Sequence, residues 1–179
     1  NLGGFANISI KKRNKIIAFD ICPVNIVMNE ISRLINLEYD SGGTIAKSGK
    51  LINNLLEKLN ELSFYKLKPP KSLCREWVEE FIKPLIKKNY KKEDILHTFC
   101  EHIAIQIGAF LNDKEALFTG GGVFNSYLMS RISYYSSSEI IIPNNKIINF
   151  KEAIIFAFLG VLRLRNEVNC LKSVTGAKK

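Results

Sequence analysis

The chain has 179 residues, of which 46% are hydrophobic and 24% charged, a composition typical of a globular protein with a sizeable core. No run reaches the roughly 18 uncharged apolar residues of a membrane span, because the apolar run at 154–162 lies between Glu152 and Arg163. The net charge of +9 suits a nucleic-acid partner, but the lysines are scattered, and their densest run, at 87–92, is typical of a solvated turn between helices. We expect one domain with no membrane span and no nucleic-acid site.

The four cysteines, at positions 22, 74, 100 and 170, show no Cys-x-x-Cys pairing. This spacing favours free thiols in a reducing cytosol, so we expect a cytoplasmic protein. Cys22 is either a buried thiol, the commoner case, or a nucleophile that has no histidine near it in sequence. The first residue is Asn1 rather than Met, and we therefore expect the chain to be a piece of a longer protein.

The beginning of the chain predicts a β-hairpin followed by a helix. Segments 5–10 and 15–19 are strand-like, and the polar residues 11–14 join them as a turn. Asp20 is expected to end the second strand, and Pro23 to begin a helix in which apolar residues recur at three- and four-residue steps. The order is therefore strand, acidic residue, turn and helix.

The middle of the chain predicts helices separated by glycine and proline. The expected segments are a glycine-containing loop at 37–50, a helix at 51–59, a helix from 73 that Pro84 bends or ends, and a long amphipathic helix at 93–111.

The last third predicts two strands and two helices. The expected segments are a strand at 115–119, a glycine turn at 120–122, a helix at 123–134, a strand at 139–142 and a helix from 150 to about 165. The final helix is apolar nearly all round, which predicts a position in the interior. A hairpin followed by alternating helices and strands predicts an α/β fold with a mixed sheet and flanking helices.

Three glycine turns are candidate ligand sites. They are Gly3-Gly4, Gly42-Gly43 and Gly120-Gly121-Gly122. Bare N–H groups at the start of a helix suit a phosphate, or let a flat base lie against the backbone. The sequence GGGVFN matches neither the GxGxxG nor the P-loop spacing, so a purely structural turn is the alternative at each position.

Two acidic residues are candidates for chemistry. Asp20 follows a strand and precedes a helix, where α/β proteins present residues to ligands, and its apolar context suits a general base. The alternative is that Asp20 caps the helix from Pro23. For Glu152 the alternative to a functional role is an acid in the first turn of a helix, favoured by the helix dipole.

His97, Cys100 and His102 have the residue types of a metal site but not the spacing. On a helix, His102 lies ~140° round from His97, so the three side chains cannot converge on one ion. We therefore predict no zinc site in this segment.

The motifs taken together resemble one known family. In order, they are NLGGFANIS at 1–9, AFDICPVN at 18–25, PPKSLCREW at 69–77, TGGGVFNSYLMSRI at 119–132, NFKEAIIFAFLG at 149–160 and SVTGA at 173–177. They are similar, over essentially the whole chain, to the motifs of the anhydro-N-acetylmuramic acid kinases. That family resembles the actin, hexokinase and Hsp70 superfamily, which implies a ribonuclease H-like lobe for this chain.

The resemblance implies a kinase that opens a 1,6-anhydro amino sugar with water while it phosphorylates the sugar O6, with ATP and Mg²⁺ as cofactors. By this resemblance Asp20 is the base that activates the water, and Glu152 contacts the sugar. Gly3 and Gly4 resemble a phosphate turn, and Gly120, Gly121 and Gly122 with Asn125 resemble the adenosine turn. Residues 1–179 would form only the C-terminal lobe, with the N-terminal lobe as its missing partner and a homodimer as a further expected assembly.

The sequence departs from the family pattern at three positions. Cys22 and Val24 stand where the commoner pattern has glycines, and Cys74 replaces another glycine. Two alternatives therefore stay open. One is a nucleotide-binding or interaction domain that has lost catalysis, and the other is a basic nucleic-acid-binding module.

Overall fold

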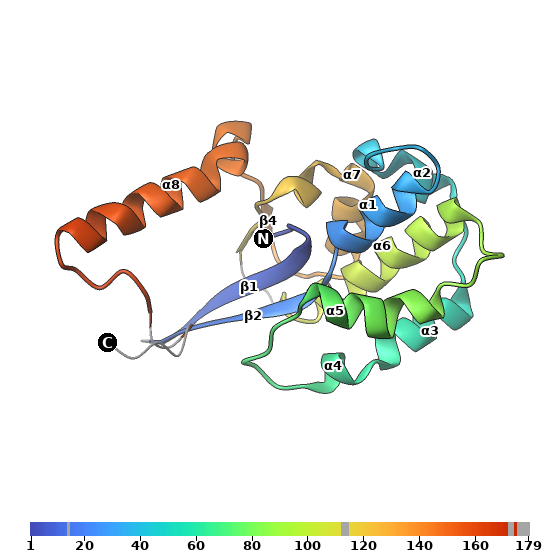
Figure 1. The fold of residues 1–179 in the computed structure, drawn as a ribbon, viewed down its shortest axis with the longest axis horizontal. Coiled ribbons are helices and arrows are strands. Elements are labelled where there is room, and N and C mark those ends of the chain that lie inside the picture. Colours follow the sequence, from blue (N-terminus) through green and yellow to red (C-terminus); the bar gives the residue numbers. More distant parts are fainter. Residues whose placement is uncertain (14, 112–114, 172–173, 175–179) are drawn as a thin grey trace.

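The computed structural model describes residues 1–13, 15–111, 115–171 and 174. It is a mixed α/β structure, as predicted, in which a β-hairpin lies beside a group of helices (Figure 1). The strands are β1 (Phe5–Lys12), β2 (Lys15–Pro23), β3 (Ala116–Leu117) and β4 (Ile140–Ile141). The α-helices are α1 (Asn25–Arg33), α2 (Thr44–Ser48), α3 (Asn53–Glu61), α4 (Ser63–Lys66), α5 (Arg75–Trp77), α6 (Lys92–Gly108), α7 (Ser126–Tyr134) and α8 (Asn145–Leu164). Short helical turns of other types are η1 (Ser41–Gly43), η2 (Val78–Ile82), η3 (Lys83–Leu85) and η4 (Gly121–Phe124).

The described strands form two separate sheets rather than the single mixed sheet that the sequence predicts. β1 pairs with β2 in antiparallel orientation, and β3 pairs with β4 in parallel orientation. Strands belong to one sheet when their backbones exchange hydrogen bonds. Among the described residues, no ladder of such bonds joins the β1–β2 pair to the β3–β4 pair.

The hairpin is confirmed, but its second strand is longer than predicted. β2 continues through Asp20 to Pro23, which pairs with Phe5, and α1 begins only at Asn25. The prediction that Pro23 begins the helix is therefore wrong, because a proline at the last position of a strand does not interrupt the ladder. A register shift also leaves Ile21 as an extra residue beside Asp20, which is a β-bulge.

The predicted loop at 37–50 contains a short helix. Asp40 accepts hydrogen bonds from the backbone N–H groups of Ile45 at 3.0 Å and Ala46 at 2.9 Å, which satisfies donors at the start of α2. Gly42 and Gly43 precede this helix with φ of 64° and 73°, a left-handed conformation that favours glycine. Side-chain capping from Asp40 therefore creates a helix that apolar periodicity over five residues could not reveal.

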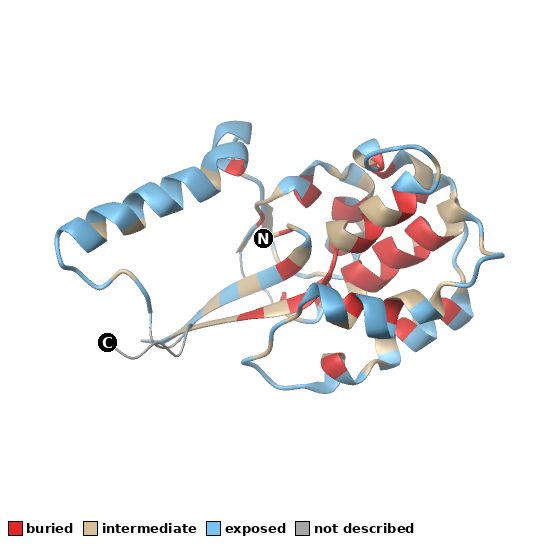
Figure 2. Cartoon of the chain, in the orientation of Figure 1, coloured by how far each residue is buried: buried red, intermediate tan, exposed pale blue. Residues whose placement is uncertain are grey.

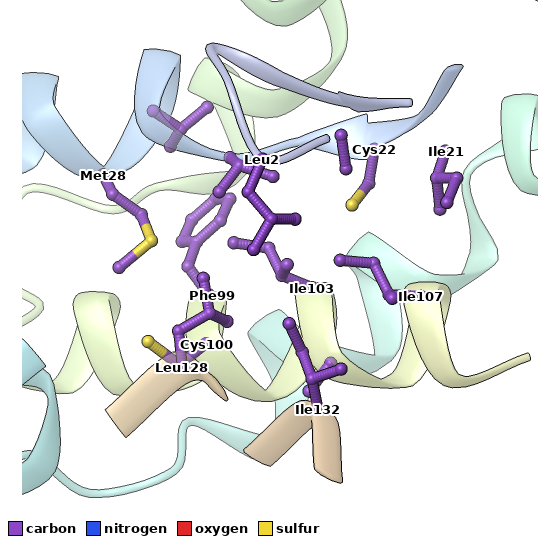
Figure 3. Packing of buried hydrophobic residues seen from close by; sticks show 14 of the residues in the cluster. Leu2, Ile21, Cys22, Met28, Phe99, Cys100, Ile103, Ile107, Leu128 and Ile132 are labelled. Atoms are coloured by element: carbon purple, nitrogen blue, oxygen red, sulfur yellow. The ribbon is translucent and has the colours of Figure 1, made fainter. Parts of the chain in front are cut away.

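The core is built around α6, which is buried on most sides rather than along one stripe. Figure 3 shows Phe99 and Ile103 of α6 between Leu2 and Cys22 on one side and Ile132 of α7 on the other. The hairpin and α1 thus cover one side of α6, and α7 covers the opposite side (Figure 3). Each side of this central helix supplies apolar contacts, which are the main source of its stability.

The final helix does not lie in the interior of the described structure. α8 projects away from the group of helices, and Figure 2 shows nearly all of it as exposed. Phe156 is 71% exposed and Leu164 is 85% exposed, whereas Ile148, near the start of α8, is 7% exposed. The prediction of an interior position is wrong here, because α8 packs against the rest of the described chain only near its start. No helix within the described residues has the length and apolar character needed to span a membrane.

Candidate functional site

The three consecutive glycines have different surroundings, so a side chain would have a different effect at each position. Gly120 has φ of +90°, and a Cβ added there would lie 2.7 Å from the carbonyl oxygen of Leu2. A Cβ added to Gly122 would lie 2.7 Å from the Cβ of Leu2. A Cβ added to Gly121 would meet no described atom within 4 Å. Two of the glycines therefore allow the chain to pass Leu2 closely, and only Gly121 presents bare backbone to open space.

A cavity of about 350 Å³ lies in front of this turn. Its lining residues are Asn25, Met28 and Asn29 of α1, Tyr39, Asp40, Ser41 and Gly42 of the following loop, and Gly121, Gly122, Phe124 and Asn125. Gly121, Gly122 and Asn125, which the sequence predicted to act together, are thus brought to one cavity. We call this space the glycine cavity.

Asn125 also holds the glycine cavity together. Its side-chain oxygen accepts a hydrogen bond from the N–H of Leu128 at 2.9 Å and so caps α7. A Cβ on Gly43 would collide with the same oxygen, so Gly43 must be a glycine for the two segments to meet. The wall of the cavity therefore depends on a close approach between the loop before α2 and the start of α7.

Asp20 lies at a second cavity and does not cap α1. The N-cap of α1 is Val24, with no side-chain hydrogen bond. Instead, Asp20 Oδ2 accepts a hydrogen bond from the N–H of Leu73 at 2.8 Å, and the N–H of Asp20 donates to the carbonyl oxygen of Lys71 at 3.0 Å. The capping alternative is therefore wrong, and Asp20 ties β2 to the segment around Lys71.

The cavity at Asp20 has a volume of about 490 Å³. It is lined by Asn7, Ala18, Phe19, Asp20, Pro70, Lys71, Ser72 and Val174, and we call it the Asp20 cavity. Lys71 Nζ donates to the carbonyl oxygen of Phe64 at 3.1 Å and lies 4.4 Å from the centre of the Phe64 ring. Burial lowers the pKa of Lys71 from its ordinary value. The Asp20 cavity thus holds one carboxylate and one partly desolvated ammonium group.

Gly3 and Gly4 directly precede β1, lie beside the start of α1 and line neither cavity. The Gly3 carbonyl accepts from the N–H of Asn25 at 3.3 Å, and the Gly4 carbonyl accepts from Val24 at 2.8 Å and Ile26 at 3.2 Å. These bonds satisfy N–H groups that a helix start would otherwise leave free.

Glu152 is exposed on α8 and lines neither cavity. Because α8 begins at Asn145, Glu152 is not in the first turn, and the alternative of an acid favoured by the helix dipole is wrong. Its neighbour Lys151 contacts the side chain of Asn1 and donates to Thr119 Oγ1 at 3.3 Å.

Several cavity residues were not predicted from the sequence. Asn25 and Asn29 lie four residues apart on α1, a spacing that places both on one face of a helix. This spacing is the sequence feature that could have indicated a shared polar site. Tyr39 and Phe124 are 56% and 47% exposed, and no sequence pattern distinguished them. Lys71 belonged to a recognised motif but carried no assigned role.

The buried cysteine and histidine side chains are structural. Cys22 is fully buried, and burial raises the pKa of its thiol, so it is a packed thiol rather than a nucleophile. His102 lies 2.7 Å from Asn60 Oδ1 through Nδ1 and 2.9 Å from the Tyr65 hydroxyl through Nε2. Among the described residues, no three His, Cys, Asp or Glu side chains are grouped so that they could hold a metal ion.

The fold and the two cavities define an α/β protein with a glycine-lined ligand cavity beside α1 and a separate carboxylate-bearing cavity on the hairpin. The family model described as anhydro-N-acetylmuramic acid kinase matches residues 1–179. The chain therefore belongs to the anhydro-N-acetylmuramic acid kinase family.

Individual relatives agree with this assignment. The chain is 35% identical to the anhydro-N-acetylmuramic acid kinase of Francisella tularensis subsp. novicida (strain U112), over 99% of this chain and 51% of the relative. It is 34% identical to the protein of the same name from Bacillus cereus (strain Q1), over 100% of this chain and 52% of the relative. A third relative, from Gamma-proteobacterium EBAC31A08, is 35% identical over 93% of this chain and 48% of its own length. The chain thus spans about half the length of the curated relatives it matches.

Proposed function

We propose that residues 1–179 are the C-terminal lobe of an ATP-dependent kinase that opens 1,6-anhydro-N-acetylmuramic acid and phosphorylates O6, giving N-acetylmuramic acid 6-phosphate in peptidoglycan recycling. The lobe has a ribonuclease H-like fold and works in the cytoplasm with an N-terminal lobe outside these residues. The whole-chain family match and the half-length coverage of the relatives support this proposal.

The observation that carries the proposal is the open backbone of Gly121 in the glycine cavity. The cavity volume of about 350 Å³ is in the range of small-molecule sites. Bare backbone at Gly121 and the amide side chains of Asn25, Asn29 and Asn125 suit a flat, polar base. In this proposal Gly120, Gly121, Gly122 and Asn125 hold the adenosine of ATP, and Gly3 and Gly4 approach its phosphates.

Asp20 is proposed as the general base. The bond from Leu73 N–H holds Oδ2, while Oδ1 accepts no hydrogen bond from the described residues, so one carboxylate oxygen is free to receive a proton. A water proton passes to Asp20 as the water oxygen bonds to the anomeric carbon and the bond from that carbon to O6 breaks. ATP, when bound, supplies the phosphoryl group that O6 accepts.

Mg²⁺ has no dedicated group of three ligands among the described residues. This fits an ion held chiefly by nucleotide phosphates, which is the usual arrangement for Mg²⁺ in kinases. No step of the proposed mechanism passes through the ion.

The remaining parts of the proposal concern Glu152 and the assembly. Glu152 is proposed to accept hydrogen bonds from the sugar, and its exposure on α8 leaves the carboxylate accessible. The homodimer stays a prediction, which the mass of the full-length protein in solution tests.

The test uses the full-length enzyme and follows ADP release that depends on the anhydro-sugar. Gly121→Leu places a side chain at the glycine cavity, and its Cβ would meet no described atom within 4 Å. The KM for ATP should therefore rise at least about tenfold, the equivalent of a modest overpacking cost. Asn54→Leu adds the same side chain on an exposed position of α3 and should leave the KM unchanged.

The outcomes separate the alternatives. Nucleotide binding by the full-length protein without sugar-dependent ADP release would favour the non-catalytic domain. DNA binding that weakens steeply with salt would favour the basic module.

A further inference from the structure

The two strands of the hairpin lie side by side (Figure 1), and Asn7 of β1 lies directly opposite Asp20 of β2. The N–H of Asn7 donates to the carbonyl oxygen of Asn1 at 3.1 Å, and the carbonyl oxygen of Asn7 accepts from the amino group of Asn1 at 2.9 Å. The N–H of Asp20 donates to the carbonyl oxygen of Lys71 at 3.0 Å. These backbone groups point away from the partner strand, so Asn7 and Asp20 form a non-hydrogen-bonded pair of the antiparallel ladder.

The side chains of such a pair lie on the same face and close together. Their Cβ atoms are ~4.5–5.5 Å apart, closer than in a hydrogen-bonded pair. Asn7 and Asp20 accordingly line the same space, the Asp20 cavity. One small molecule, such as water, can therefore contact the amide group of Asn7 and the carboxylate of Asp20 at the same time.

The side chain of Asn7 has no structural task among the described residues. Asn7 is exposed, and its amide group forms no hydrogen bond with the described chain. The bonds that Asn7 does form use its backbone, which every residue except proline provides in full. The fold therefore does not explain why position 7 carries an amide.

The other charged residue that lines the Asp20 cavity is directed elsewhere. Lys71 Nζ donates to the carbonyl oxygen of Phe64 and lies over the Phe64 ring. Asp20 Oδ2 accepts from the N–H of Leu73, while Oδ1 accepts no hydrogen bond from the described residues. The polar atoms left without a described partner at this strand pair are therefore Asp20 Oδ1 and the amide group of Asn7.

We propose that Asn7 holds the attacking water beside Asp20. The inference rests on the proposed function, which makes Asp20 the general base. One water proton passes to Asp20 Oδ1, and Asn7 Oδ1 accepts a hydrogen bond from the other proton. With both protons engaged, a lone pair of the water oxygen is left for the anomeric carbon.

The step balances without a further reactant. The bond from the water oxygen to the anomeric carbon forms as the bond from that carbon to O6 breaks. The proton that Asn7 holds stays on the new anomeric hydroxyl group, and the proton on Asp20 is released to solvent after the reaction. O6 takes the phosphoryl group of ATP, and ADP leaves.

Asn7→Leu in the full-length enzyme tests the role of the amide. Leucine has a similar branched shape but no polar atoms, so kcat should fall at least about tenfold, the effect of one lost hydrogen bond to a reacting group. The KM for ATP should stay unchanged, because Asn7 does not line the glycine cavity. The urea midpoint should stay unchanged as well, because the side chain has no described partner. An unchanged kcat in folded protein overturns the proposal.

Asn7→Asp tests the distance between the two side chains. Aspartate keeps an acceptor oxygen for the water, but a second carboxylate opposite Asp20 disfavours the ionised base. The acidic limb of the pH profile of kcat should therefore move upward by about half a pH unit or more.

Ser9→Asp is the matched control. Ser9 is the next residue of β1 on the same face, is exposed, and lies opposite Ala18 rather than Asp20. Its carboxylate would lie about 7 Å further along the strand and should move the acidic limb much less. Equal shifts in the two variants, or no shift in the Asn7→Asp enzyme, overturn the proposal.

Asp20→Asn, alone and combined with Asn7→Leu, separates this inference from the proposed function. If both side chains act on one water, Asn7→Leu should lower kcat much less in the Asp20→Asn background than in the unmodified enzyme. Reductions that multiply in full overturn the shared water. Near-normal turnover of Asp20→Asn would contradict the base assigned in the proposed function, whereas low turnover of Asp20→Asn beside normal turnover of Asn7→Leu would contradict the role of Asn7 alone.

Discussion

Individual residues at the candidate site combine structural and functional demands. Gly120 and Gly122 are required by the passage of the chain past Leu2, whereas Gly121 faces the glycine cavity. Asp20 likewise has one oxygen committed to Leu73 and one that accepts no bond from the described residues. Substitutions at these positions can therefore separate folding from activity.

Asp20→Asn should lower kcat of the full-length enzyme by at least ~10², the usual contribution of a general base, with little change in the KM for ATP. The amide oxygen of asparagine can still accept the hydrogen bond from Leu73 N–H, so the fold should persist. Steady-state kinetics with both substrates, alongside urea unfolding, gives the answer. Near-normal turnover in a stable variant would remove Asp20 from the mechanism.

Gly120→Ala and Gly121→Ala should differ in stability. Alanine at Gly120 combines φ of +90° with a contact 2.7 Å from the Leu2 carbonyl, which should cost about 1–3 kcal/mol of unfolding free energy. Alanine at Gly121 meets open space and should change the unfolding free energy by less than about 0.5 kcal/mol. Urea unfolding of both full-length variants measures the difference, and equal costs would contradict the division of roles within the turn.

At the scale of elements, α6 and α8 show how far apolar pattern and location can differ. α6 carries polar residues yet is buried, because His102, Thr98 and Glu101 each have hydrogen-bond partners from neighbouring segments. α8 is more apolar yet exposed, because the described chain offers it few partners beyond its start. The apolar pattern of a helix indicates how much the helix gains from burial. Whether the helix is buried depends on which other segments are available to pack against it.

The buried histidine of α6 predicts a pH dependence of stability. Burial lowers the pKa of His102 to about 3 in the folded state, from 6.5 in the unfolded state. Between these two pKa values the unfolded state binds more protons than the folded state. The contribution of neutral His102 to stability is therefore fully present above about pH 6.5 and is lost as the pH falls toward 3. Over this range the free energy of unfolding should fall by at most about 1.4 kcal/mol per pH unit.

The measurement is urea unfolding of the full-length protein and of His102→Gln at pH 7, 5.5 and 4.5. The glutamine variant is expected to be less stable at pH 7, because it loses contacts to Asn60 and Tyr65, but to lose less stability on acidification. Identical pH slopes for the two proteins would show that His102 does not titrate in this range.

At the scale of the whole molecule, the two cavities do not share lining residues, and Glu152 lies at neither. A reaction that uses the nucleotide, the sugar and Asp20 together needs these groups to meet. The proposed N-terminal lobe would supply the other walls of the site. Under this proposal, residues 1–179 alone lack a complete site.

Residues 1–179 alone should accordingly have no measurable kinase activity, because effective phosphoryl transfer depends on positioning by both walls of the site. The coupled assay for sugar-dependent ADP release should show turnover with the full-length protein and none above background with the isolated residues. Turnover by residues 1–179 comparable to that of the full-length enzyme would contradict the two-lobe assignment.

Local sequence was sufficient for much of this protein. The hairpin, the helices α1, α3, α6 and α7, and the turn at Gly120–Gly122 could be predicted, because turn residues and apolar spacing act over a few neighbours. The ordered motifs were sufficient for the family, which the whole-chain match confirms.

Contacts between distant segments decided the rest. The end of β2 at Pro23 depends on pairing with Phe5, and the bond from Asp20 goes to Leu73, 53 residues away. The glycine cavity exists because Asn25, Asp40 and Gly121 converge from three separate segments. The exposure of α8 depends on which partners are present. Backbone pairing, cavity walls and burial depend on segments that meet only after folding. The local sequence of each segment therefore does not predict them.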